Sequence, residues 1–290
     1  NEDKMWKLST RTIVERKMEE LALSCAFEHL PNLPLALEKL IASLVESSDA
    51  VSLKKRLSQE LECNACEWLR DAIVDYLKLF ESGHLPVLDL LEADMLRRVW
   101  VFFWIQCEKP SNASAVNQKS ERMIAGERKI MGKCIDLLFT HQRMEYDCSE
   151  CGVSDNQTKE FYDGSLKIVK VLRDMMYSLY ESASRNIREL TLVGFKQKFT
   201  MVLCDAPAGY VTRIVRANSL QLSEEPDDVS NMLLPILKAT YQGRLLMGHT
   251  NMLVRKAPKR VELNLSDSDI ILSCYNVGSG KKKRRRDCEI

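Results

Sequence analysis

Apolar residues recur at helical spacing through most of the first 190 residues, and this pattern constrains the fold more than any other feature. Leu53, Leu57 and Leu61, for example, lie four residues apart and so share one face of a helix. Helices of this kind are expected in six segments: 12–30, 35–45, 52–80, 85–107, 121–143 and 161–198. The pattern predicts a multi-helix body in which each helix buries one apolar stripe.

The sequence changes in character near residue 198. Phe199–Cys204 is rich in strand-forming residues, and Tyr210–Val215 alternates apolar and polar residues as a half-exposed strand does. Pro226 begins a helix that is expected to reach about Tyr241. Further strands are expected at residues 251–255, 261–265 and 270–275, and the polar segment 146–158 is expected to be a loop.

These patterns predict a mainly α fold, namely a multi-helix body with a smaller C-terminal α/β part. The expected domains are a helical interaction domain over residues 1–197 and a small α/β module over residues 198–277. Residues 278–290 are expected to form a Gly-Ser-Gly spacer followed by a disordered polybasic tail.

Charge is concentrated at the C-terminal end. The whole chain holds 42 Lys+Arg and 41 Asp+Glu, a formal net charge of +1. Six cations and two acids lie in the last ten residues, so the rest of the chain carries a net charge of −3. Bulk charge therefore does not support nucleic-acid binding by the body of the protein.

The tail is a run of six adjacent cations: Lys281, Lys282, Lys283, Arg284, Arg285 and Arg286. Such a run stays solvated, because buried charges need partners. It predicts a nuclear localisation signal that binds the acidic groove of an import receptor, and hence a nuclear protein, with the cytoplasm as the alternative. Other interpretations are attachment to nucleic acid or anionic lipid, and a solvated tail without a partner. Prenylation fits poorly, because Cys288 lies third rather than fourth from the end.

Two Cys-x-x-Cys motifs are the strongest metal-binding pattern. Cys63 and Cys66 form the first and lie in the middle of an expected helix, whereas Cys148 and Cys151 form the second in an expected loop. Four thiolates can hold one tetrahedral zinc ion, and His141 is a further possible ligand. The alternatives are plain structural cysteines and a redox pair. Several of the ten cysteines lie in apolar runs, as expected in a reducing compartment.

Aromatic residues are dense in one short segment. Trp100, Phe103 and Trp104 lie in a run, Met95–Cys107, that is too short to cross a membrane and is flanked by charges. No membrane span is therefore expected. The aromatic side chains are interpreted either as the core of a helical domain or as a partner-binding surface.

The strand Phe199–Cys204 ends in the sequence Asp205-Ala206-Pro207-Ala208-Gly209. This segment resembles the Asp-bearing strand of the MinD/ParA-like ATPases and, more loosely, a motif of RNA cytosine methyltransferases. The resemblance implies a nucleotide- or S-adenosylmethionine-dependent enzyme. Those families also need an early glycine-rich loop, and no Gly-x-Gly-x-x-Gly occurs in this chain.

No catalytic constellation emerges from the residue patterns, because the four histidines stand apart and no nucleophile motif occurs. The leading hypothesis is a non-catalytic nuclear scaffold or adaptor that docks partner proteins, in a chromatin or cell-division assembly. The first alternative is a nucleic-acid-associated protein that uses the basic tail. The second is an enzyme built on the Phe199–Gly209 strand.

Overall fold

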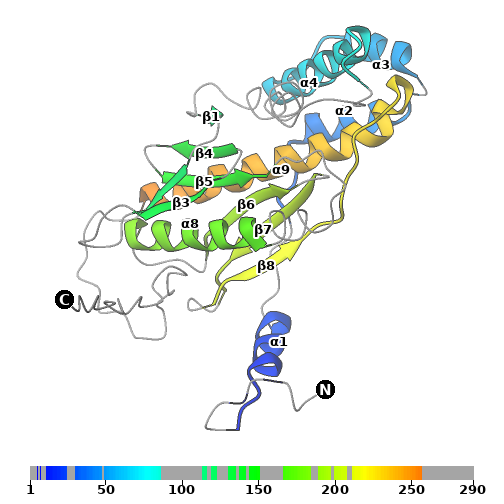
Figure 1. The fold of residues 1–290 in the computed structure, drawn as a ribbon. Coiled ribbons are helices and arrows are strands. Elements are labelled where there is room, and N and C mark those ends of the chain that lie inside the picture. Colours follow the sequence, from blue (N-terminus) through cyan, green and yellow to red (C-terminus); the bar gives the residue numbers. More distant parts are fainter. Residues whose placement is uncertain are drawn as a thin grey trace, which may run out of the picture.

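A mixed six-stranded sheet forms the centre of the protein (Figure 1). The structure is a computed structural model, and it describes residues 5, 7, 11–24, 30–47, 49–85, 113–115, 119–122, 130–134, 137–141, 144–150, 166–183, 189–196, 199–207 and 211–256. The strands lie in the order β1 (Ala113–Ala115), β4 (Leu137–His141), β5 (Met144–Ser149), β6 (Thr191–Lys196), β7 (Thr200–Asp205) and β8 (Arg213–Arg216). Only β5 and β6 pair in parallel, and the other neighbours are antiparallel. A separate two-stranded sheet joins β2 (Lys119–Arg122) to β3 (Ile130–Cys134).

The parallel pair requires a crossover, and helix α8 (Ile168–Ala183) supplies it between β5 and β6. Gly194 of β6 allows α8 to approach closely. A Cβ atom at this position would lie 3.1 Å from the side chains of both Ile168 and Leu172. Helix α8 therefore covers one face of the sheet, and its apolar stripe is buried there.

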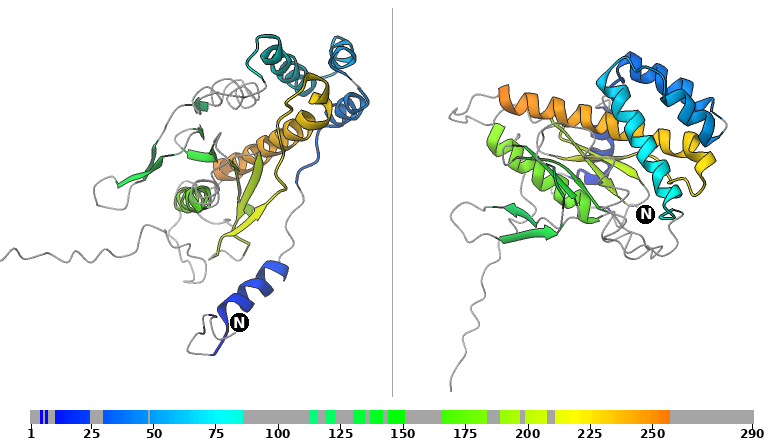
Figure 2. Two further views of the ribbon diagram at one scale, coloured as in Figure 1. Left: turned by 45° about the vertical axis from the view of Figure 1, so that its right-hand side comes forward. Right: turned by 90° about the horizontal axis from the view of Figure 1, so that it is seen from above.

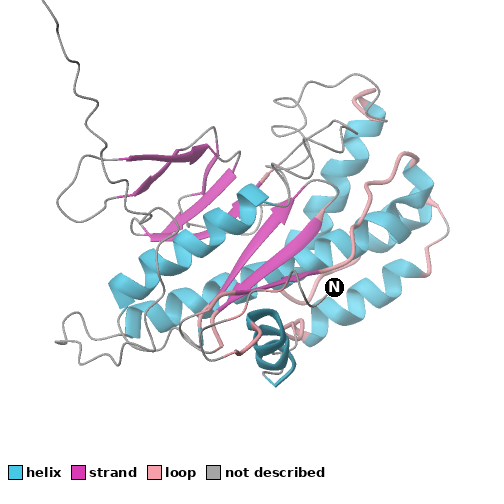
Figure 3. Ribbon diagram, turned by 60° about the horizontal axis from the view of Figure 1, so that its bottom comes forward, coloured by secondary structure: helices cyan, strands magenta, loops and turns pink. Residues whose placement is uncertain are grey.

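The opposite face is covered by the long helix α9 (Val229–Lys256), which follows a short 3-10 turn at Pro226–Asp228. A Cβ atom on Gly243 of α9 would lie 3.3 Å from the Phe195 side chain and 3.4 Å from that of Val193. The view from above in Figure 2 shows α8 and α9 on either side of the strands, and in Figure 3 the strands run between helices.

Three N-terminal helices pack against the first half of α9: α2 (Leu35–Val45), α3 (Ala50–Leu57) and α4 (Asn64–Glu81). One continuous hydrophobic core joins them to the sheet, and it includes Leu37, Leu44, Leu57, Leu69, Ile73, Val193, Phe195, Leu233 and Leu237. The Tyr76 hydroxyl donates a hydrogen bond to the Ser223 carbonyl at 2.9 Å, so α4 also fixes the segment that leads into α9.

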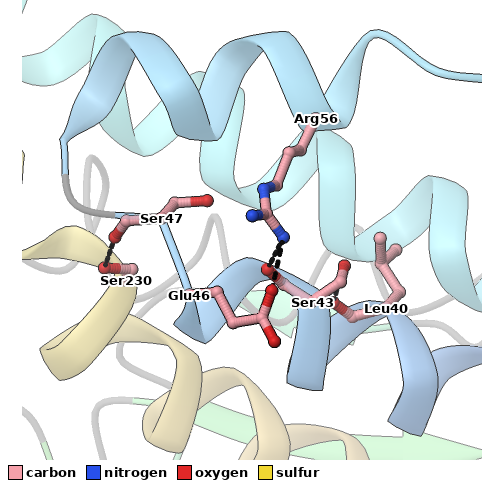
Figure 4. Close-up of polar contacts among 6 residues, drawn as sticks. All are labelled: Leu40, Ser43, Glu46, Ser47, Arg56 and Ser230. Atoms are coloured by element: carbon pink, nitrogen blue, oxygen red, sulfur yellow. Dashed lines mark hydrogen bonds and ion pairs between the residues drawn. The ribbon is translucent and has the colours of Figure 1, made fainter.

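Polar contacts hold the corner between α2 and α3 (Figure 4). The Arg56 guanidinium donates to the Ser43 carbonyl and lies 3.2 Å from the Glu46 carboxylate. The Ser230 hydroxyl at the start of α9 donates to the Ser47 carbonyl at 3.0 Å. Asp49 caps α3, because its carboxylate accepts from the Ser52 backbone N–H at 2.8 Å. These contacts therefore hold α2 and α3 together and join the segment between them to the start of α9.

The predicted mainly α fold with a small C-terminal α/β part is wrong, because a mixed sheet occupies the middle of the chain. The expected helix over residues 121–143 contains strands β3 and β4, and the expected loop over residues 146–158 begins with β5. The expected helix over 161–198 ends earlier, since α8 stops at Ala183 and β6 follows. Apolar residues there are spaced to suit either a helix or a strand, and distant pairing partners decide between the two.

Other expected elements agree better with the structure. Helix 35–45 and the two strands near residues 200 and 213 are confirmed. The expected strand at 251–255 is wrong, because α9 continues to Lys256. The expected boundary between residues 197 and 198 falls within the β6–β7 hairpin, which pairs along its whole length. The strands expected at 261–265 and 270–275 lie outside the described residues.

Within the described part of the chain, no helix combines the length and the apolar composition that crossing a membrane requires.

Candidate functional site

Several predicted site residues lie outside the described residues. These are the six cations of the tail, Lys281–Arg286, the aromatic residues Trp100, Phe103 and Trp104, and Cys151. The import-signal and aromatic-surface hypotheses therefore stay predictions from the sequence.

The cysteines of the first Cys-x-x-Cys motif lie at the start of a helix, and the prediction that they lie in mid-helix is wrong. The expected helix over 52–80 is interrupted between α3 and α4, and Cys63 is the residue immediately before α4. Its carbonyl accepts from the backbone N–H groups of Cys66 and Glu67 at 2.9 and 3.0 Å. The Sγ atoms of Cys63 and Cys66 lie 3.2 Å apart.

Cys148 does not join this pair in one core. It is fully buried on β5, within the core between the sheet and α8, whereas Cys66 belongs to the core that α4 shares with α9. Among the described residues, no group of three or more His, Cys, Asp or Glu side chains is arranged to hold a metal ion. The shared zinc site remains a prediction, because Cys151 lies outside those residues.

The Asp-bearing strand predicted near residue 200 is β7, which is buried along its whole length. Asp205 at its end faces Arg213 of β8. The guanidinium donates to both carboxylate oxygens, with Nε 3.0 Å and Nη2 2.5 Å from them. This two-point ion pair ties β7 to β8, and it accounts for an aspartate at this position without a nucleotide.

A charged pair lies at the carboxyl end of the parallel strands. Glu150 follows β5 and its backbone N–H donates to the Phe195 carbonyl of β6 at 2.9 Å. Its carboxylate lies 2.6 Å from the Lys167 ammonium, just before α8, and the two side chains are only 8% and 18% exposed. In α/β sheets, ligands bind outside the carboxyl ends of parallel strands. Glu150 and Lys167 are therefore the candidate ligand-binding site of the sheet.

Two further polar residues of β5, Asp147 and Ser149, face the side of the sheet that α9 covers. Asp147 pairs with Val193, whose side chain lies against α9, so Asp147 is on the α9 side. Asp147 and Ser149 are both fully buried, and among the described residues neither the carboxylate nor the hydroxyl has a hydrogen-bond partner. Burial raises the pKa of Asp147 well above its usual value, and the Cys148 backbone N–H opposes this shift without cancelling it. The Asp147 side chain therefore tends to hold its proton.

A candidate docking element lies at the N-terminal end of the described molecule. Helix α1 (Val14–Ser24) stands apart from the sheet and its covering helices in Figures 1 and 2. Its side chains Met18 and Leu23 are 41% and 81% exposed. Exposed apolar side chains on a short helix are a common feature of segments that dock into a partner.

Sequence reasoning missed the Glu150–Lys167 pair, because the two residues are 17 positions apart in the chain. It had also assigned the polar positions of β5 to a loop. The alternation of Met144, Tyr146 and Cys148 with polar residues was the signal that indicated a strand.

Comparison with known proteins adds no relative: no family model, no curated protein and no solved structure matches this chain.

Proposed function

We propose that this protein is a non-catalytic scaffold or adaptor that docks partner proteins in the nucleus, in a chromatin or cell-division assembly. The observation that carries the proposal is helix α1, which exposes the apolar side chains of Met18 and Leu23 to water. The basic tail supports the nuclear part of the proposal, through the import receptor that such a run of cations fits.

Helix α1 has 11 residues, and an isolated helix of this length is only marginally stable in water. Docking α1 onto a partner would bury an exposed apolar side chain such as Met18 and stabilise the helix at the same time. Seven large apolar side chains are exposed in the described residues, and five of them lie between residues 18 and 51: Met18, Leu23, Leu35, Val45 and Val51. Leu35 and Val45 lie on α2 and Val51 lies on α3, away from α1 in Figure 1, so α1 by itself is the proposed docking element.

Met18→Glu is expected to weaken partner binding by about 2 kcal/mol, roughly thirtyfold in affinity, because a charge replaces an apolar anchor. The matched control is Met252→Glu on α9, since Met252 is also 41% exposed. Both variants should unfold within about 0.5 kcal/mol of the wild type, because both side chains lie at the surface. Affinity purification from nuclear extract measures the partners. Proteins recovered in stoichiometric amounts with the wild type and Met252→Glu, but lost with Met18→Glu, support the proposal; equal recovery with all three contradicts it.

The second candidate is a nucleic-acid-associated protein, and the Glu150–Lys167 pair is the observation that favours it. Lys167 provides a cation next to the carboxyl ends of β5 and β6, where α/β proteins bind phosphate-bearing ligands. Glu150 provides a carboxylate, a ligand that Mg²⁺ prefers. Desolvating such a pair costs free energy that the ion pair itself regains only in part, and a role in ligand binding would account for its presence. The basic tail would add attraction to the phosphate backbone that does not depend on sequence.

Changing all six cations of Lys281–Arg286 to alanine separates the two candidates. An import signal predicts loss of nuclear accumulation in cells, with unchanged binding to a single-stranded oligonucleotide in solution. Nucleic-acid association predicts that the slope of log affinity against log salt falls by up to about 4, since each phosphate contact contributes about 0.7 on a single strand. Unchanged distribution and unchanged oligonucleotide binding would remove the tail from both proposals.

A further inference from the structure

The two cysteines at the start of α4 form a close and isolated dithiol. Cys63 and Cys66 share a hydrogen bond, and their Sγ atoms are 3.2 Å apart. Both thiols are free. A disulfide has an S–S distance of about 2.0 Å, so the two sulfur atoms need to approach by only about 1.2 Å. One helical turn therefore holds the two thiols in position to form a bond.

The two thiols differ in access to solvent. Cys63 is partly exposed, whereas Cys66 is 2% exposed and packs in the core beside Leu69. Burial, followed by the hydrogen bond and the charge of Cys63, raises the pKa of Cys66 to about 12. Cys63 is therefore the thiol that meets a reagent from solution, and Cys66 is the thiol that acts second.

We propose that Cys63 and Cys66 are a reversible modification site, a dithiol that small-molecule disulfides such as oxidised glutathione convert to an internal disulfide. The Cys63 thiolate attacks the reagent, forms a mixed disulfide and releases one molecule of reduced glutathione. The Cys66 thiolate then attacks the Cys63 sulfur, closes the internal bond and releases the second. The protein loses two electrons and two protons, and one glutathione disulfide becomes two thiols. An excess of reduced glutathione reverses both steps.

The surroundings favour a regulated bond over a structural one. The disulfide would close a loop of only four residues, which stabilises the fold little compared with long loops. Exposed carboxylates at Glu60, Glu62 and Glu67 surround the pair. Their negative charge repels anionic glutathione disulfide and slows its approach. Oxidation should therefore become faster at higher salt, because salt screens this repulsion. A dithiol in this setting responds to the redox state of the cell.

Peptide mapping of the full-length protein tests the site directly. Trypsin cleaves after Arg56 and Arg70, and the peptide 57–70 contains Cys63 and Cys66 and no other cysteine. The protein is equilibrated with reduced and oxidised glutathione and its free thiols are alkylated. It is then digested, and the peptide masses are measured by mass spectrometry. The fraction of peptide 57–70 with an internal disulfide should rise at least about tenfold from the most reducing to the most oxidising mixture, and fall again on return.

The chain supplies its own comparison. Peptide 144–159 contains the second Cys-x-x-Cys motif with the same spacing and no other cysteine. Cys148 is fully buried, so its thiol should stay reduced in mixtures that oxidise peptide 57–70, when the protein is oxidised in its folded state and its remaining thiols are alkylated after denaturation. Oxidation of peptide 144–159 before peptide 57–70 would overturn the assignment.

Two variants test the order of the steps. In Cys66→Ser, Cys63 should stop at the mixed disulfide with glutathione, whereas in Cys63→Ser the buried Cys66 should gain none. Three results overturn the proposal: peptide 57–70 that stays fully alkylated in oxidised glutathione, a glutathione adduct on Cys66 in Cys63→Ser, and thiols that alkylate only after a chelator removes zinc. The peptide result needs no variant, so the test holds even if Cys66→Ser folds poorly.

Discussion

Replacing Lys167 with methionine is expected to lower the free energy of unfolding by about 3 kcal/mol, the largest single effect anticipated here. Glu150 is only 8% exposed, and Lys167 lies 2.6 Å from its carboxylate. Removing the ammonium takes away the cation beside a buried carboxylate, and breaking a buried ion pair typically costs 3–5 kcal/mol. The lower figure applies, because Lys167 is itself 18% exposed and water screens part of the interaction.

Two further variants decide whether charge pairing is the cause. Lys167→Met combined with Glu150→Leu should recover most of the lost stability, because no unpaired charge remains. Lys238→Met on α9 is the control, since Lys238 is an exposed lysine, and its effect should stay within about 0.5 kcal/mol. Urea denaturation gives all four free energies. A Lys167→Met protein as stable as the wild type would show that the pair is not held in the folded protein. If the double variant is stable but no longer binds oligonucleotide, the pair serves binding.

The second large effect is a pH dependence that comes from Asp147. Burial raises the pKa of this carboxyl in the folded protein, whereas in the unfolded chain it takes its usual value near 4. The folded state therefore holds a proton that the unfolded state releases. Stability from this group is complete below pH 4 and is lost as the pH rises towards the folded pKa, by up to about 1.4 kcal/mol per pH unit.

Asp147→Asn should remove this contribution, because asparagine is uncharged at every pH. The unfolding free energy of wild type minus that of the variant should fall steadily from pH 4 upwards, as measured by urea denaturation at each pH. Glu224→Gln is the control, since Glu224 is an exposed carboxylate, and it should leave the pH profile almost parallel to that of the wild type. A flat difference curve for Asp147→Asn would mean that Asp147 is ionised and paired in the folded protein.

Strand β5 explains why the candidate site of the sheet could not be found from the sequence. Its polar positions, including Asp147 and Ser149, suggest a solvated edge or loop, yet α9 and the sheet bury them completely. A strand's polar side faces water only if nothing covers it. Glu150 and Lys167 likewise meet only because α8 crosses back over the sheet. Neither the burial of these strand residues nor the Glu150–Lys167 contact depends on local residue spacing, so neither could be predicted from a local sequence pattern.

The dithiol is an intermediate case. The spacing of Cys63 and Cys66 indicated a pair of neighbouring thiols, and the structure brings the two sulfur atoms within 3.2 Å. The position of the pair at a helix start was missed, because the apolar stripe continues from Leu57 through Leu61 to Trp68 across the break between α3 and α4. A stripe reports which residues are buried, and it does not show where the backbone stops being helical.

The sequence by itself determined the elements whose own residues suffice to specify them, such as helix α2 with its apolar stripe and strand β7 with its run of strand formers. It also determined where the charge lies, with six cations in the tail of a mildly acidic chain. Only the tertiary structure decided that β3, β4 and β5 are strands, that β5 runs parallel to β6, and that Glu150 meets Lys167. The physical reason is that strand pairing, burial and ion pairing join residues far apart in the chain, and their energy depends on the partner as much as on the residue itself.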